Sequence, residues 1–180
     1  MKEEVVLGDG SRGLIRSLTP QDREALVAGF ASLSPESRIR RFFFDKKKLS
    51  DEELHRLTHP DGVNHLALGM EVQVEEKGTC LPVGVARCFR DQSNRAQAEV
   101  ALVTHDDWQG LGVGTALTRC LAGVAWEAGI RRWNAAIFCQ NKTVLNLLSR
   151  VGLLTEERVI GSGVMEVICE LDPPVRRLGS

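Results

Sequence analysis

Residues 106–117, Asp106-Asp107-Trp108-Gln109-Gly110-Leu111-Gly112-Val113-Gly114-Thr115-Ala116-Leu117, place three alternate glycines between an alternating apolar segment and an amphipathic helix. Residues 99–104 alternate as a strand does, and residues 115–128 carry the apolar stripe of a helix. Glycine lets a ligand approach the backbone closely, and a helix N-terminus favours an anion. Since the charged side chains nearby are acidic, backbone amides would have to bind that anion. The stretch therefore predicts a phosphate-binding loop, with a flexible turn before an ordinary helix as the alternative.

Two common phosphate loops do not match. The dinucleotide fingerprint G-x-G-x-x-G needs a third glycine where Thr115 stands, and Glu127 comes too early for the acidic residue expected roughly 20 positions further on. A Walker loop needs a lysine directly after its last glycine, and no glycine here has one at that spacing. The loop belongs to another class of phosphate site.

The motif resembles that of a known family. Gln109 to Gly114 matches the Q/R-x-x-G-x-G/A motif of the GCN5-related N-acetyltransferases, in which it holds the pyrophosphate of acetyl-CoA. Asn141 and the later pair Gly152-Leu153 resemble the family's N-x-x…G-F segment, with Leu153 in place of Phe. Residues 34–43 (SPESRIRRFF) and 98–101 (AEVA) are similar to the acetyltransferase domain of bacterial protein-lysine acetyltransferases. The resemblance runs from about Gly13 to about Leu171.

The resemblance and the hydrophobic periodicity predict the same fold. Residues 63–75, 81–90 and 97–104 alternate as an antiparallel meander, and a strand over 133–139 and a hairpin over 154–171 follow the glycine loop. Helix starts are expected at Thr19-Pro20, Ser34-Pro35 and Ser50. We expect an α/β fold with a mixed, mainly antiparallel sheet and helices on both faces. One N-acetyltransferase domain is expected over 12–172, between a flexible segment at 1–11 and a tail at 173–180.

The resemblance implies acetyl-CoA as co-substrate and assigns its contacts. The backbone at the end of the central strand pairs with the pantetheine arm, through Leu102, Val103 and Thr104. The loop and the start of the helix bind the pyrophosphate, through Gln109, Gly110, Leu111, Gly112, Val113, Gly114 and Thr115. Asn141 either hydrogen-bonds the pantetheine or caps the helix that follows it.

Glu99 is the candidate catalytic base. It interrupts an apolar strand close to the glycine loop, and the resemblance places the subgroup's catalytic glutamate at this residue. A carboxylate in apolar surroundings is a better base for an alkyl ammonium. The alternative is an exposed Glu, or one paired with a basic residue such as Arg87. The family's usual tyrosine acid is missing, because the chain has no Tyr and Leu148 stands at that place; Cys139 and Ser149 are weaker candidates.

Composition excludes several other classes of function. A formal net charge of −1 gives no reason to expect nucleic acid or a membrane surface as partner. The five cysteines fall singly, which favours reduced thiols and a cytoplasmic protein. The first residues lack the apolar core of a signal peptide. We expect no metal site, since His55 and His59 share a helical face without an evident third ligand.

The acceptor is the part that sequence defines least. A protein lysine is the preferred amine, and a small-molecule amine or a non-catalytic acyl-CoA-binding role are the alternatives. An open acidic groove would suit a lysine-bearing surface, and a closed pocket would suit a metabolite. Arg38, Arg40 and Arg41 either bind a substrate carboxylate or the 3′-phosphate of CoA, or form a solvated helix face. The oligomeric state is open, with a homodimer as one alternative.

Overall fold

The described part of the chain forms one sheet, with strands in the order β1-β2-β3-β4-β5-β6-β8-β7. The computed structural model describes residues 1–74 and 79–174, so the tail expected at 173–180 lies mostly outside the described residues. The strands are β1 (Lys2–Val6), β2 (Arg12–Ser17), β3 (His65–Val74), β4 (Thr79–Arg90), β5 (Gln97–Thr104), β6 (Arg132–Phe138), β7 (Gly152–Gly161) and β8 (Val164–Leu171). Neighbouring strands run antiparallel except β5 and β6. The expected mixed, mainly antiparallel sheet is confirmed.

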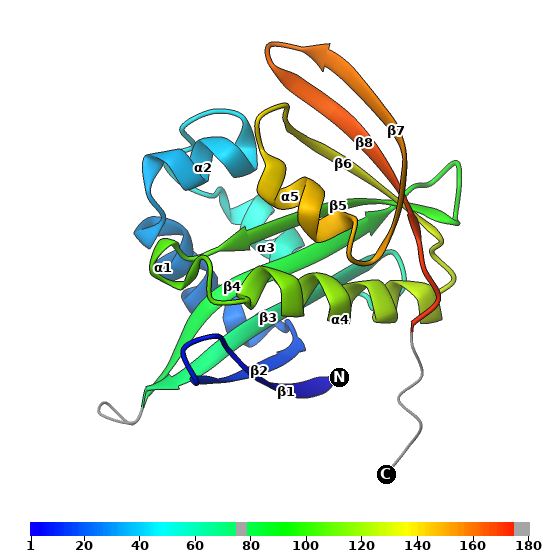
Figure 1. Ribbon diagram of the computed structural model, residues 1–180. Helices are drawn as coiled ribbons and strands as arrows, with labels where there is room; N and C mark the ends of the chain where they lie inside the picture. The colour runs from blue at the N-terminus through cyan, green and yellow to red at the C-terminus, as the bar shows by residue number, and fades with distance from the viewer. Residues whose placement is uncertain (75–78, 175–180) are drawn as a thin grey trace.

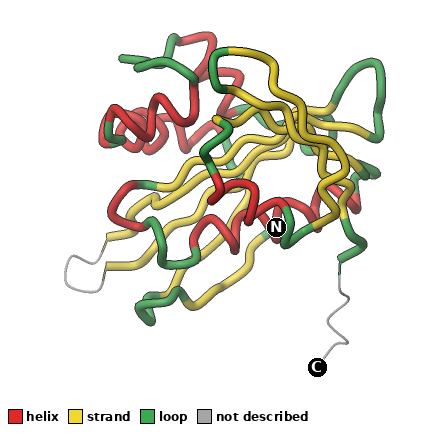
Figure 2. Tube along the Cα trace, turned by 45° about the horizontal axis from the view of Figure 1, so that its top comes forward, coloured by secondary structure: helices red, strands yellow, loops and turns green. Residues whose placement is uncertain are grey.

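Helices cover both faces of this sheet, as predicted (Figures 1 and 2). The helices before β3 gather on one face, and the helix after the glycine loop lies across the other. The α-helices are α1 (Arg23–Ser32), α2 (Pro35–Phe42), α3 (Asp51–Thr58), α4 (Val113–Glu127) and α5 (Lys142–Leu148). Two short 3₁₀ helices, η1 (Pro20–Asp22) and η3 (Asp106–Trp108), precede α1 and the glycine loop.

Helix starts follow the polar residues that the sequence offers as caps. The Ser34 hydroxyl accepts a hydrogen bond from the Ser37 N–H at 3.1 Å, and Pro35 occupies the first position of α2. At α3, Ser50 and Glu53 form a reciprocal capping box. These bonds satisfy N–H groups that a helix cannot satisfy itself.

The N-terminal segment differs from the expectation of a flexible stretch over residues 1–11. Lys2–Val6 form β1, which pairs with β2 at the edge of the sheet. Strand pairing uses backbone groups, so it is open to a segment as polar as this one. Leu7 is buried, and the Gly8 N–H donates to the Leu111 carbonyl at 2.8 Å, which ties the segment to the glycine loop.

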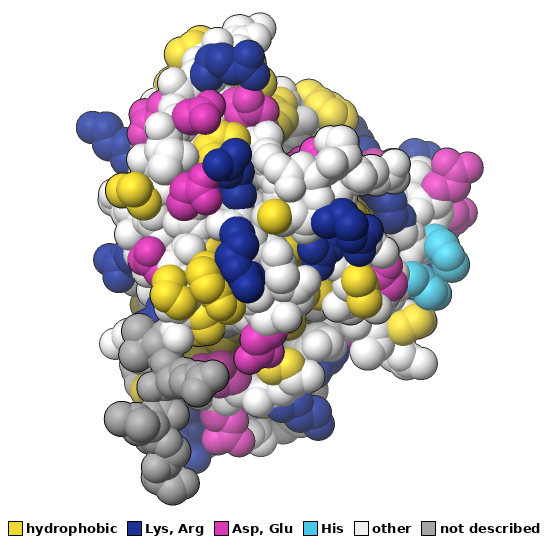
Figure 3. Space-filling model, turned by 90° about the vertical axis from the view of Figure 1, so that its right-hand side faces the viewer, with side chains coloured by type: hydrophobic (Ala, Val, Ile, Leu, Met, Phe, Trp, Pro, Cys, Tyr) yellow, Lys and Arg dark blue, Asp and Glu magenta, His cyan; other side chains and the backbone are white. Residues whose placement is uncertain are grey.

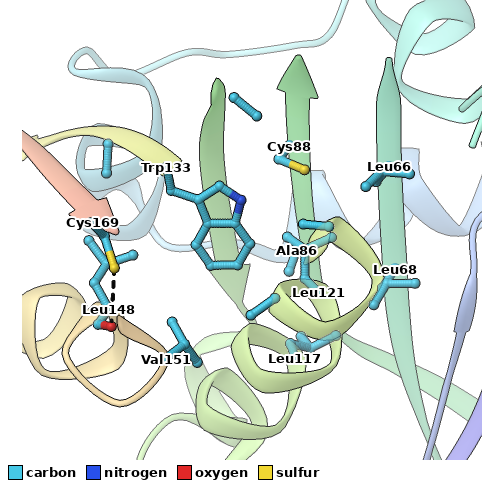
Figure 4. Close-up of a cluster of buried hydrophobic side chains, with 14 of the residues drawn as sticks. Leu66, Leu68, Ala86, Cys88, Leu117, Leu121, Trp133, Leu148, Val151 and Cys169 are labelled. Atoms are coloured by element: carbon cyan, nitrogen blue, oxygen red, sulfur yellow. Dashed lines mark hydrogen bonds between the residues drawn. The ribbon is translucent and has the colours of Figure 1, made fainter. Parts of the chain in front are cut away.

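The main core lies between α4 and the sheet (Figure 4). Leu117 and Leu121, one turn apart on α4, face Leu66, Leu68 and other apolar side chains of the central strands. Trp133 of β6 is completely buried beside them. Because α4 directly follows the glycine loop, burial of its apolar face fixes where the helix N-terminus points.

Strands β5 and β6 part soon after they meet. Their parallel pairing covers only Gln97 with Arg132, Ala98 with Trp133 and Glu99 with Asn134. Beyond Glu99, β5 stays paired with β4, whereas β6 stays paired with β8. In Figure 1 the half of the sheet formed by β6, β7 and β8 turns away from β1–β5. The sheet therefore opens at its centre.

One face of the molecule agrees with the near-zero formal charge. On the side of β7, basic and acidic side chains are interspersed (Figure 3). Among the described residues, no helix is both long enough and apolar enough to cross a membrane.

Candidate active site

The glycine loop adopts a backbone that needs glycine at two positions. Gly110 and Gly112 have φ angles of 77° and 98°, in the left-handed region, and a Cβ at either would meet no atom within 4 Å. Gly112 is the N-cap of α4, so the free N–H groups of the first turn begin there. Gly114 differs, because its Cβ would lie 3.2 Å from Leu147 Cδ1. The loop thus leaves open space in front of a helix N-terminus, the arrangement that suits an anion.

Hydrogen bonds fasten this loop to α2. The Asp106 carboxylate accepts from the Ser34 N–H at 2.9 Å, the Ser34 hydroxyl at 2.8 Å and the Ser37 hydroxyl at 2.6 Å. The Gln109 amide donates to the Thr104 carbonyl at 3.4 Å and the Ser37 hydroxyl at 3.3 Å. Partial burial raises the pKa of Asp106, but the hydrogen bonds from the two serines outweigh it and hold the pKa below its usual value. Sequence reasoning missed this role of Asp106.

A cavity of about 350 Å³ lies where β5 and β6 part, and we call it the β5–β6 cavity. Its walls come from the end of β5, from β6, the glycine loop, α4, α5 and α2. Nine of the eleven residues predicted to bind acetyl-CoA line it, namely Leu102, Val103, Thr104, Gln109, Gly110, Gly112, Gly114, Thr115 and Asn141. The structure thus brings together segments that are up to 39 positions apart in the sequence.

The other two predicted cofactor residues, Leu111 and Val113, lie outside these walls. The Leu111 carbonyl accepts the hydrogen bond from Gly8, and the Val113 side chain is buried in the core at 1% exposure. A role of these two residues in pyrophosphate binding stays a prediction, and the buried Val113 side chain is not available for it.

Glu99 stands at the apex of the opening and lines the β5–β6 cavity. It occupies the last β5–β6 pair, opposite Asn134, and pairs with Phe89 on its β4 side. Its side chain is exposed, so the expected apolar enclosure is missing; the departure of β6 removes the neighbour that would have covered it. The alternative pairing with Arg87 is also missing, since the described residues contain no Glu99–Arg87 ion pair.

The candidate residues in and around α5, for cofactor contact and for acid catalysis, differ in burial and in hydrogen bonding. Asn141 caps α5, since its side chain accepts from the Val144 N–H at 3.3 Å, and it also lines the β5–β6 cavity. Leu148, at the place of the family's tyrosine, is buried at 3% exposure and reaches the same cavity. Cys139 is exposed, and the Ser149 hydroxyl donates to the Asn146 carbonyl at 3.1 Å. Neither of these two lines the cavity.

The three arginines on α2 have different partners. Arg38 pairs with Asp45, and Arg40 pairs with Glu36 on the exposed face of the helix. The Arg41 guanidinium lies 4.9 Å from the centre of the Phe42 ring. Burial lowers the pKa of Arg41, and the nearby negative charge of Glu99 opposes that shift. The charged side chains on the walls of the β5–β6 cavity are therefore two arginines and one glutamate.

Histidines and carboxylates do not assemble a metal centre in the described residues, where no group of three or more His, Cys, Asp or Glu side chains could hold an ion. The rings of His55 and His59 stack on each other with centroids 3.9 Å apart. These two side chains form an exposed pair on α3.

The chain matches the model of the family described as "Acetyltransferase (GNAT) domain" over residues 12–154. It is 31% identical over 163 residues to Acetyltransferase Pat of Mycolicibacterium smegmatis, covering 89% of this chain and 46% of that protein. It is 32% identical over 148 residues to Acetyltransferase PA5475 of Pseudomonas aeruginosa, covering 82% of this chain and 78% of that protein. The chain thus spans about half the length of the first of these relatives.

Solved structures show the same fold. The crystal structure of the GNAT domain of S. lividans PAT superposes with a TM-score of 0.81 at 32% identity, covering 94% of this chain and 97% of that one. A putative acetyltransferase, yncA of Salmonella typhimurium, solved with its cofactor acetyl-CoA, superposes with a TM-score of 0.69 at 18% identity, covering 91% and 98%. The chain therefore belongs to the GCN5-related N-acetyltransferase (GNAT) family, whose members transfer an acetyl group from acetyl-CoA.

Proposed function

We propose that the protein transfers the acetyl group of acetyl-CoA to a primary amine by direct attack of the amine on the thioester. The observation that carries this proposal is the position of Glu99, which stands in the last β5–β6 pair and lines the same cavity as the glycine loop. Glu99 lies where β5 and β6 part, and the glycine loop offers an anion site in the same cavity. This arrangement fits a substrate that extends from the loop to Glu99.

The loop geometry supports acetyl-CoA as the molecule in this cavity. Gly110 and Gly112 keep open space in front of the α4 N-terminus, where amides would bind the pyrophosphate. Backbone groups of Leu102 to Thr104 on the open side of β5 would pair with the amides of the pantetheine arm. Asn141 has an amide group beyond its capping oxygen that is available to the same arm.

Glu99 acts in this proposal as the general base. An alkyl ammonium has a pKa of about 10.4, so it must lose a proton before the nitrogen can form a bond to the carbonyl carbon. As the carbon–sulfur bond breaks, the electron pair leaves on sulfur. A thiol pKa near ~8.5 makes that a tolerable leaving group, so a dedicated acid at the place of Leu148 is dispensable.

The cavity walls favour a metabolite over a lysine-bearing protein surface. A groove for lysine would be acidic, whereas on the described walls Arg41 offsets the charge of Glu99, and Arg40 is paired with Glu36. We therefore place the small-molecule amine ahead of the protein lysine that the sequence favoured.

Replacing Glu99 with Gln tests the assignment. We expect kcat to fall by about 10²–10⁴-fold, the usual contribution of a general base, with the Kd of acetyl-CoA within twofold of wild type. Release of CoA thiol across a panel of amines measures the rate, and calorimetry measures binding. Glu127→Gln, an exposed change at the far end of α4, is the matched control. An unchanged rate at saturating substrates excludes Glu99 as the base, and acetyl-CoA binding without thiol release for any amine favours a non-catalytic module.

A further inference from the structure

Arg87 is a buried guanidinium without an opposite charge. Its side chain extends from β4 and the residue is 4% exposed. Nη1 donates to the Leu57 carbonyl at 2.9 Å, and the described residues provide no ion pair for it. Burial lowers the pKa of Arg87 to about 9, and the positive charges of Arg41 and Arg56 push in the same direction.

Two other partly buried arginines of this protein, Arg16 and Arg38, are paired with carboxylates. Arg16 bonds both oxygens of Asp22, at 2.9 and 2.6 Å, and also contacts Glu71. Arg38 bonds Asp45 at 3.1 Å. A charge removed from water without a partner is unfavourable, so buried charges are normally paired. Arg87 is more deeply buried than Arg16 and Arg38 and lacks the carboxylate partner that each of them has.

Arg87 lines a second cavity, which we call the helix-side cavity. It has a volume of about 100 Å³ and lies between α1–α3 and the sheet. Its walls are mainly apolar, with Phe30, Leu57 and Val85 among them. Arg41, Ala101 and Val103 line both this cavity and the β5–β6 cavity, so the two cavities adjoin at these residues.

The sheet register places Arg87 close to Glu99. Arg87 pairs directly with Ala101, and Glu99 is two residues from Ala101 on the same face of β5. Such diagonal neighbours across an antiparallel pair are about 7–8 Å apart. A group bound by Arg87 therefore lies within one small molecule's length of the proposed base.

We propose that the acceptor carries a carboxylate as well as its amine, as a free amino acid does, and that Arg87 and Arg41 bind this carboxylate while the amine lies at Glu99. The proposal rests on the acetyl transfer proposed above. A guanidinium binds a carboxylate through two parallel hydrogen bonds, which the free donors of Arg87 allow. The small, mostly apolar cavity supplies few further donors for the third oxygen of a phosphate. A lysine within a protein has no carboxylate of its own on that side chain.

Matched pairs of acceptors test the proposal. Each free L-amino acid, together with 4-aminobutyrate and 5-aminopentanoate, is compared with its own carboxamide in a thiol-release assay. We expect kcat/KM to be about 10- to 100-fold higher for the acid of the preferred pair, the range for a hydrogen-bonded ion pair. Equal or better use of the carboxamides, or preferred acetylation of lysine in a peptide, overturns the proposal and leaves the proposed function standing. Failure to acetylate any amine counts against the proposed function first.

Variants separate carboxylate binding from a structural role. In Arg87→Met and Arg41→Met the acid-to-amide ratio of kcat/KM should fall toward one, whereas Arg150→Met, an exposed arginine outside both cavities, should keep it. This ratio does not depend on how much of a variant is folded. Without substrate, Arg87→Met should have an unchanged or higher Tm, because it removes an unpaired buried charge. A lower Tm with an unchanged ratio means that Arg87 is structural.

Discussion

Gly112 and Gly114 are both glycines of one motif, yet the structure requires them for different reasons. Gly112 has a left-handed backbone with open space around its Cα, so the conformation excludes other residues. Gly114 has an ordinary helical backbone, and its restriction is the nearby Leu147 side chain. At the scale of single residues, the motif therefore combines a conformational requirement with a packing requirement.

Alanine substitutions at Gly112 and Gly123 test the conformational requirement. We expect Gly112→Ala to lower the free energy of unfolding by about 1–2 kcal/mol, the cost of a left-handed residue with a Cβ. Gly123 lies inside the same helix with nothing within 4 Å of its Cβ position. Gly123→Ala should therefore stabilise the protein by about 0.5–1 kcal/mol. Urea unfolding measures the free energy of unfolding of both variants. Equal changes of the same sign would show that the left-handed backbone at Gly112 does not disfavour alanine.

The sequence predicted which residues line the cavity better than it predicted whether each of them is buried, exposed or paired. The motif and the strand before it were enough to bring Glu99 and the glycine loop into one site. Glu99 is exposed because β6 separates from β5 beyond this residue, and no local sequence pattern predicts that separation. The sequence suggests Arg87 only as a partner for Glu99. An arginine in an alternating strand gives the same pattern whether it is paired, exposed or buried without a partner.

At the scale of elements, the glycine loop and α2 behave as one unit. The Asp106 carboxylate accepts from both serines at the start of α2, while Gln109 connects the loop to the end of β5. Because α2 also carries Arg41, these bonds connect the proposed cofactor side of the cavity to the proposed acceptor side.

Substitution of Asp106 tests this coupling. We expect Asp106→Asn to lower the free energy of unfolding by about 1–2 kcal/mol at neutral pH, since it weakens charged hydrogen bonds at a helix start. The pKa of Asp106 is lowered in the folded protein, so its contribution is present above the unfolded value of 3.8 and is lost as the pH falls through the lower folded value. The difference between variant and wild type should therefore shrink in acid.

Unfolding curves at neutral and acidic pH measure this difference. The exposed neighbour provides the control, because Asp107→Asn should change stability by less than about 0.5 kcal/mol. An Asp106 effect that is the same at every pH would mean that its charge does not matter.

The positions of most helices and strands were predictable from the sequence, and β1 is the exception. Ser34-Pro35 and Ser50 mark α2 and α3 because capping is a local interaction. Residues 2–6 were expected to be flexible, since KEEVV has little hydrophobic character. They form β1 because β2 offers them backbone partners, and a distant strand is not visible in a local pattern.

At the scale of the whole molecule, one buried histidine links folding to pH. His65 is 7% exposed, stacks on Phe89 with ring centroids 4.1 Å apart, and its Nε2 has no hydrogen-bond partner in the described residues. Burial lowers the pKa of His65 to about 4, with the positive charges of Arg87 and Arg56 acting in the same direction and Asp61 opposing them. The folded protein therefore keeps this ring neutral where the unfolded chain would take up a proton.

The sign of the pH effect follows from this depressed value. Between about pH 4 and 6.5 the unfolded state binds the proton and the folded state does not, so stability falls as the pH is lowered through this window. We expect a loss of about 2–3 kcal/mol. His65→Phe keeps an aromatic ring and should lack this part of the slope, whereas His55→Gln, at an exposed position, should keep it. Urea unfolding from pH 4 to 7 measures the slopes, and identical slopes for wild type and His65→Phe would contradict the assignment.

The short pairing of β5 and β6 gives the sheet two further edges inside the molecule. Beyond Glu99 and Asn134, backbone groups that would join these strands face a cavity instead. An unpaired strand edge is a template for another chain, so the empty protein is open to aggregation at its own centre. In the proposed function acetyl-CoA covers these edges, and binding stabilises the fold by RT ln(1 + [L]/Kd). On this proposal the protein that holds acetyl-CoA is more stable than the empty protein.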